Sequence, residues 1–134
     1  MILTLLPPDP EDKKMSDQGF WLEEFPVAIT VTDADGTILT MNARSRKSFE
    51  KEGGGALVGR SVFDCHPEPA RTKTLALFEG RTASHYTVRK DAQRKIIHQI
   101  PWYRNGGFAG FVEISIPIPD TLPHFDRDKA GTDD

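Results

Sequence analysis

Alternating apolar and polar residues mark five segments of the chain as β-strands. In chain order they are 27–32, 37–41, 84–90, 95–103 and 108–116. Turn-forming residues separate consecutive strands. They are Asp33-Ala34-Asp35-Gly36 between the first two strands and Asn105-Gly106-Gly107 before the last strand. The pattern therefore predicts a pair of strands early in the chain and three consecutive strands late in it.

Short helices are predicted between the two groups of strands. Asn42 is suited to cap a helix over 43–51, because its side chain accepts a hydrogen bond from the first turn. Pro67 and Pro69 precede a second helix that runs to Glu79. Two strands, a block of helices and three strands make an α+β order, with a split five-stranded sheet around the helices.

Both ends of the chain differ in composition from its middle. Prolines and acidic residues gather at the ends, whereas residues 20–117 carry a small positive net charge. The predicted organisation is a flexible tail over 1–14, an N-terminal helix over 15–25, a folded domain over 26–118 and a flexible acidic tail over 119–134. The apolar side of the N-terminal helix, formed by Trp21, Leu22 and Phe25, is predicted to support a homodimer.

Composition excludes several classes of protein. The 134 residues include one cysteine, Cys65, which excludes an internal disulfide and a multi-cysteine zinc site, and makes the cytoplasm the default compartment. No apolar run approaches the ~20 residues that cross a bilayer, so a membrane protein is not expected. The net charge of −3 argues against nucleic acid as a partner.

Three motifs occur in the order and spacing typical of one family. The first runs from Ile29 through the Asp33–Gly36 turn to Asn42, the second is Leu57-Val58-Gly59-Arg60, and the third is Gly110-Phe111-Val112-Glu113-Ile114-Ser115-Ile116. Together they resemble a PAS domain over about residues 20–117. The resemblance implies a five-stranded antiparallel sheet with short helices covering one face, and a sensory or ligand-binding function.

A narrower resemblance rests on Cys65-His66-Pro67. This sequence is similar to a Cys-His-Pro step in a PAS subgroup found beside hemerythrin-like domains, and Ile96-Ile97-His98 is similar to the start of a late strand there. The chain contains no hemerythrin-like domain. It also lacks the Asp-Ile-Thr step and helix that usually lead to an effector, so we expect a separate effector protein to act in trans.

His98 is the most informative candidate for a ligand contact. Alternate residues of a strand share a face, and His98 belongs with Ile96, Ile100 and Trp102 to the more apolar set of its strand. That set is predicted to face the core, opposite Ile114. His98, Trp102 and Ile114 would then contact a ligand in the pocket. The alternatives for His98 are a structural buried histidine and an axial haem ligand.

Cys65 and His66 are further candidates. They form either a simple turn or a pair that contacts ligand, or senses redox state, at the mouth of the pocket. A zinc site from Cys65, His66, His85 and His98 is an alternative, although these residues lack a typical close pair of ligands. No other metal site is predicted.

These observations predict a cytoplasmic sensory module that binds a small molecule or cofactor between sheet and helices and signals through dimer or partner contacts. The alternatives are a haem-binding sensor and a protein-interaction domain without ligand. Catalysis is not expected, because the strand set predicted to face the pocket offers no titratable residue besides His98.

Overall fold

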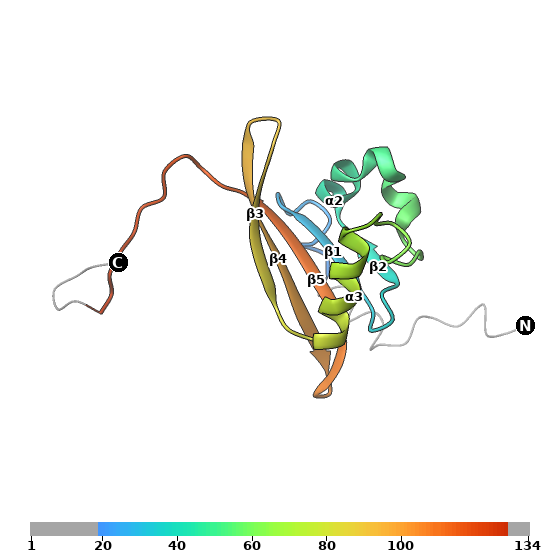
Figure 1. Ribbon diagram of the computed structural model, residues 1–134. Coiled ribbons are helices and arrows are strands. Elements are labelled where there is room, and N and C mark those ends of the chain that lie inside the picture. Colours follow the sequence, from blue (N-terminus) through green and yellow to red (C-terminus); the bar gives the residue numbers. More distant parts are fainter. Residues whose placement is uncertain (1–18, 129–134) are drawn as a thin grey trace, which may run out of the picture.

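One antiparallel sheet forms the centre of the molecule. The computed structural model describes residues 19–128, and its strands are β1 (Ala28–Thr32), β2 (Ile38–Met41), β3 (Ser84–Lys90), β4 (Gln93–Arg104) and β5 (Gly107–Pro117). They lie in the order β2-β1-β5-β4-β3, and each neighbouring pair is antiparallel (Figure 1). The predicted fold class is therefore confirmed, and the late strands lie close to their predicted bounds.

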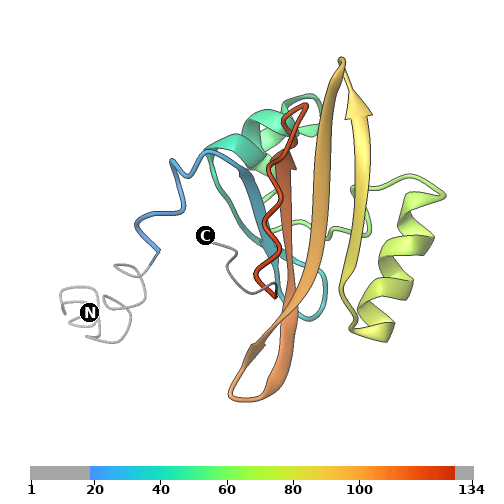
Figure 2. The ribbon, with the colours of Figure 1, turned by 90° about the vertical axis from the view of Figure 1, so that its left-hand side faces the viewer.

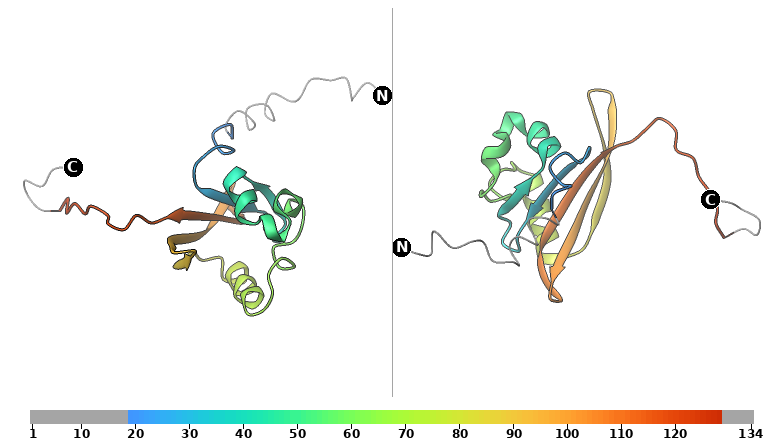
Figure 3. Two further views of the ribbon diagram at one scale, coloured as in Figure 1. Left: turned by 90° about the horizontal axis from the view of Figure 1, so that it is seen from above. Right: turned by 180° about the vertical axis from the view of Figure 1, so that it is seen from behind.

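The helices lie on one side of this sheet. They are α2 (Ala43–Ser48), the 3-10 turns η2 (Glu50–Glu52) and η3 (Gly54–Leu57), and α3 (Ala70–Gly80). Views from the front and from above place all of them on the same face, which we call the inner face (Figures 1 and 3). The opposite, outer face carries no helix within residues 19–128 (Figure 2).

A small apolar core joins the inner face to the helices. Ile38, Met41 and Leu57 are buried together, and Phe49 and Val62 pack against them. This core lies at the β1–β2 side of the sheet, under α2 and η3. It leaves the space beneath α3 to be filled by other side chains, which is where the cavity described below begins.

Asn42 fastens the first two strands to α2. Its side-chain oxygen accepts hydrogen bonds from the backbone N–H groups of Ile29 and Ser45, at 2.9 and 3.1 Å. Its amide group donates to the carbonyl oxygen of Val27 at 2.8 Å. Asn42 is almost fully buried, so these bonds replace those that water made in the unfolded chain. The predicted helix cap is confirmed.

A glycine is required where β5 passes β1. Gly110 has a φ of 140°, and a Cβ atom built on it would lie 2.0 Å from the carbonyl oxygen of Thr32. Because Gly110 carries no side chain, the indole of Trp102, its partner on β4, reaches across to donate a hydrogen bond to that same oxygen at 2.9 Å. Three strands are tied together at this point.

The chain ends differ in part from expectation. Of the helix predicted over 15–25, residues 15–18 lie outside the described residues. Residues 19–24 form turns instead, because hydrogen bonds from Leu22 to Gly19 and from Phe25 to Leu22 close four-residue turns just before Pro26. Glu23 is held instead by an ion pair with Arg46 on α2. The predicted tail over 1–14 lies outside the described residues, as do 129–134. Residues 118–125 have no regular secondary structure and extend away from the sheet (Figure 1).

None of the helices within 19–128 has the length and apolar character needed to cross a membrane.

Candidate ligand-binding cavity

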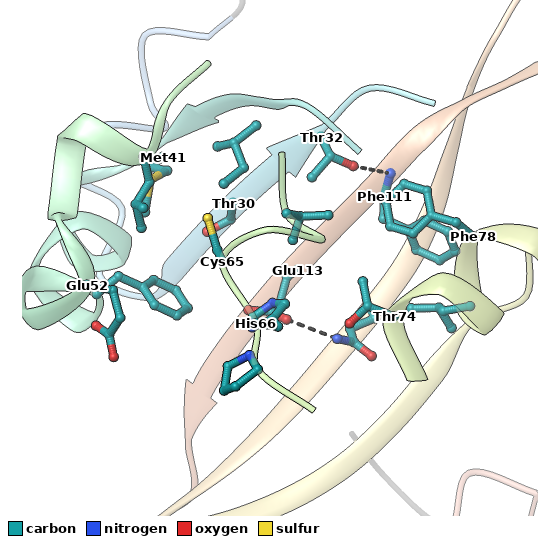
Figure 4. Close-up of a pocket in the computed structure, with 17 residues that line it drawn as sticks. Thr30, Thr32, Met41, Glu52, Cys65, His66, Thr74, Phe78, Phe111 and Glu113 are labelled. Carbon is teal, nitrogen blue, oxygen red and sulfur yellow. Dashed lines mark hydrogen bonds between the residues drawn. The ribbon is translucent and has the colours of Figure 1, made fainter. Parts of the chain in front are cut away.

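A cavity of about 200 Å³ lies between the inner face of the sheet and the helices. Its walls come from both layers of the fold: β1, β2, β4 and β5 below, Phe49 at the end of α2 with η2 and η3 on one side, and α3 with the preceding loop on the other (Figure 4). It is lined by Thr30, Thr32, Ile38, Met41, Phe49, Glu52, Leu57, Val62, Cys65, His66, Pro67, Thr74, Leu77, Phe78, Gln99, Phe111 and Glu113.

Aromatic rings form the wall beneath α3. Phe78 of α3 packs on Phe111 of β5 with ring centroids 4.7 Å apart, and its other edge meets Phe63 at 5.0 Å. Such tilted and edge-on contacts place the positive edge of one ring against the negative face of another. Together with the apolar core, they make most of the cavity surface apolar.

One end of the cavity is polar. Gln99 and Glu113 are register partners on β4 and β5, and the amide of Gln99 donates a hydrogen bond to the Glu113 carboxylate at 3.0 Å. His66 and Thr74 lie near this pair from the helical side (Figure 4). Within residues 19–128, the carbonyl oxygen of Gln99 and the second carboxylate oxygen of Glu113 accept no hydrogen bond from the protein, so both are available as acceptors.

The charged groups of the cavity share one sign. Among the described lining residues, Glu52 and Glu113 are acidic, and lysine and arginine do not occur. Tyr86 lies on the same face of β3, beside this end of the cavity. Burial raises the pKa of the Tyr86 hydroxyl, and the negative charge of Glu113 raises this pKa further. The site thus favours neutral or positively charged groups.

The strand parity predicted from sequence is wrong. Gln99, Phe111 and Glu113 face the cavity, which places His98, Trp102 and Ile114 on the outer face. The prediction assumed that the more apolar side of each strand faces the core. In this sheet the inner face carries polar cavity residues, and the more apolar set lies on the face without helices.

His98 meets a second histidine on the outer face. Its Nδ1 atom lies 2.8 Å from the Nδ1 atom of His85, its register partner on β3. His98 therefore cannot serve as an axial haem ligand inside the cavity. Nor do the four residues of the zinc alternative come together, because Cys65 and His66 line the cavity on the other side of the sheet. Within residues 19–128, no three metal-ligating side chains are grouped.

Cys65 and His66 both line the cavity, although they are adjacent in sequence. The sulfur of Cys65 faces the apolar part, where it packs against the buried core, and His66 lies toward the polar end (Figure 4). They are the two predicted site residues that reach this space. Gln99 and Glu113 were missed, and the one signal in their favour was a polar residue among apolar neighbours in the middle of each of the last two strands.

Comparison with known proteins identifies the same architecture. The family described as the PAS fold matches residues 22–120. The PAS domain of BvgS from Bordetella pertussis is similar with a TM-score of 0.61 at 17% identity, covering 81% of this chain and 88% of that one. A C-terminal domain from Streptococcus mutans is similar with a TM-score of 0.64 at 19% identity, covering 77% of this chain and 84% of that one. A sensor histidine kinase from Vibrio cholerae is similar with a TM-score of 0.54 at 13% identity, covering 83% of this chain and 96% of that one. At these identities the structures show the fold alone. No curated protein sequence matches the chain significantly.

Proposed function

Since the chain belongs to the family of PAS domains, which are typically sensory modules, we propose that it senses a small organic molecule bound in the cavity on the inner face of its sheet. The observation that carries this proposal is the combination of an apolar chamber with a polar end. Binding sites for small molecules are mostly apolar, with a few convergent polar groups that fix orientation. Modules of this family are generally not enzymes.

The volume of the cavity supports a ligand of about one ring. A dry cavity of about 150 Å³ in another protein binds benzene, so 200 Å³ accommodates a slightly larger molecule. A haem macrocycle is several times larger than one ring. This size, together with the outward position of His98, favours a small ligand over the haem sensor, whose remaining cavity imidazole is His66.

The lining residues favour a neutral or cationic ligand. An anionic group would meet Glu113 and Glu52 without a lysine or arginine to compensate it, and burying such a charge unpaired is costly. A hydrogen-bond donor, by contrast, would find acceptors on Gln99 and Glu113. We therefore expect an apolar body that carries a hydroxyl or amine group at one end.

Thermal unfolding with matched one-ring probes tests the proposal. Benzylamine and benzyl alcohol should raise the melting temperature, and benzoate should do so least. At about ten times its Kd a ligand stabilises by about 1.4 kcal/mol, which is a shift of several degrees for a domain of this size. Equal effects of all three probes, or the strongest effect from benzoate, would contradict the charge argument.

A matched pair of substitutions on α3 locates the binding. Thr74 lines the cavity, whereas Thr72 is exposed on the same helix. Thr74→Trp should fill the cavity and abolish the shift with benzylamine, and Thr72→Trp should leave it unchanged. If both variants respond as the wild type does, the probes bind elsewhere and the proposal fails.

The output is proposed to be self-association through the outer face. Its central side chains on β1, β4 and β5 are Val31, Ile96, Ile100, Trp102, Val112, Ile114 and Ile116, together with His98. Ile29 lies on the same face but is buried, and Arg94 lies on it near the turn between β3 and β4. Apart from His98 this central set is apolar, and it contains no carboxylate, ammonium or guanidinium group, so two copies would meet there without repulsion between like charges. A change in the packing of β4 and β5 when ligand binds would then alter the dimer contact. A separate effector protein would respond to the dimer in trans. The free thiol of Cys65 is compatible with the cytoplasm.

A further inference from the structure

The outer face carries a pair of imidazoles beside its apolar centre. His85 and His98 are directly opposite each other on β3 and β4, with ring centroids 5.0 Å apart and Nδ1 atoms 2.8 Å apart. A direct contact between these two nitrogens requires one ring to donate its Nδ1 proton and the other to accept it. At least one of the two rings is therefore neutral, with a lone pair aimed at its partner.

We propose that His85 and His98 form a binding site for a divalent transition metal ion of the Zn²⁺ or Cu²⁺ class. Neutral imidazole nitrogen is a preferred ligand of these ions. Two nitrogens bound at 2.0–2.1 Å to one tetrahedral zinc are about 3.3 Å apart, and at a square-planar copper they are about 2.9 Å apart. The observed separation needs only a small rotation of the rings to admit the metal.

Replacing the hydrogen bond between the rings by two bonds to the metal conserves the protons and the charge of the pair. In the metal-free pair, one ring carries its proton on Nδ1 and the other on Nε2. When the metal binds both Nδ1 atoms, the first ring moves its proton to Nε2 through solvent, so two neutral rings remain neutral. Protonation of either ring to the cation competes with the metal, and binding should weaken as the pH falls.

The position of the pair leaves room for the metal and its remaining ligands. β3 is an edge strand, and His85 is exposed on it. On the other side His98 is opposite Ile114, and the nearest residues of the same face along the two strands are Thr87, Ile96 and Ile100. Arg89 and Arg94 lie farther along this face, toward the end of the hairpin. Water, or the histidines of a second copy, would complete the coordination.

Titration of tag-free protein with ZnCl₂ in a calorimeter tests the site. The wild type should bind Zn²⁺ at micromolar concentration, with one ion per chain or one per two chains, and either ratio supports the proposal. His85→Gln and His98→Gln should each weaken binding by about tenfold or more, since loss of a second-sphere partner alone costs 10–100-fold. The electron paramagnetic resonance spectrum of bound Cu²⁺ should change from two coupled nitrogens to one in either variant.

The other two histidines provide matched controls. His66 lines the cavity on the other face of the sheet, and His124 lies in the C-terminal segment. His66→Gln and His124→Gln should bind Zn²⁺ as the wild type does. Absence of binding at millimolar Zn²⁺, or unchanged binding in both His85→Gln and His98→Gln, would overturn the proposal. Because none of these measurements uses the cavity, they are independent of the proposed ligand.

Discussion

The two faces of this sheet are built from the same strands and differ in almost every other respect. On the inner face, Gln99 and Glu113 form a hydrogen-bonded pair in a cavity covered by helices. On the outer face their neighbours in sequence, Ile100 and Ile114, lie on a surface without helices within residues 19–128. The covered face is thus the more polar one in the middle of the sheet.

This contrast shows that burial and hydrophobicity are separate properties in a fold that encloses a cavity. A sheet face that lines a ligand chamber needs polar groups to orient the ligand, and these are tolerated because they bond to each other. An apolar face without a cover is costly in water and is typical of an interaction surface. The apolar pattern of β4 and β5 therefore does not mark the core, and it supports the proposal that a partner binds the outer face.

The largest expected effect is a difference in the free energy of unfolding between a substitution on the helical side of the sheet and one on the outer face. Asn42→Ala should lower the free energy of unfolding by about 2–4 kcal/mol, because it leaves buried backbone groups of β1 and α2 unpaired. Ile100→Ala on the outer face should cost about 1 kcal/mol or less in the monomer, since 38% of Ile100 is already exposed. Urea unfolding at low protein concentration measures both, and equal losses would contradict the comparison.

A change of charge on the outer face should affect association rather than folding. Ile100→Glu should weaken the dimer about tenfold or more, because it buries a carboxylate in an apolar interface. Leu75→Glu is the matched control, since Leu75 is also 38% exposed but lies on α3, on the other side of the sheet. Sedimentation equilibrium measures the dissociation constants.

The same measurement tests the interface expected from the sequence. Trp21 and Phe25 are exposed and packed edge-to-face against each other, in the segment that precedes β1. If Trp21→Ala dissociates the dimer and Ile100→Glu does not, the interface lies at the N-terminal segment and the outer-face proposal is wrong.

The smallest expected effect is a change in the pKa of Tyr86, beside the polar end of the cavity. Burial is the main cause that raises the pKa of Tyr86 above its usual value, and the charge of Glu113 adds to it. Glu113→Gln should therefore lower the pKa of Tyr86 only in part. Because the raised pKa favours the neutral hydroxyl in the folded state, stability is present below the ordinary tyrosine pKa and is lost as the pH rises through the folded value.

Absorbance at 295 nm, which reports the tyrosinate, follows this titration. A Tyr103→Phe background leaves Tyr86 as the one tyrosine, because the sequence contains two. An unchanged pKa of Tyr86 in Glu113→Gln would contradict the placement of Tyr86 beside the polar end of the cavity.

The sequence was sufficient for the fold and for part of the site. Turn residues and alternating strands predicted the sheet, and Asn42 was predicted as a cap, since these features depend on local chemistry. The faces of β4 and β5 were not predictable in the same way. Alternation divides a strand into two sets, but which set lies inside depends on where the helices pack, and the more apolar set here faces outward. The pairing of His85 with His98 depends on strand register, which the pattern does not specify.

A nuclear Overhauser experiment with methyl-labelled isoleucine and methionine compares the two faces most directly. Ile38 and Met41 line the cavity, whereas Ile100 and Ile114 lie on the outer face. With benzylamine as the probe, cross-peaks should join its ring protons to the methyl groups of Ile38 and Met41 and to neither outer isoleucine. Cross-peaks to Ile100 or Ile114 without any to Ile38 or Met41 would contradict the account, because the ligand would then bind the face assigned to the partner.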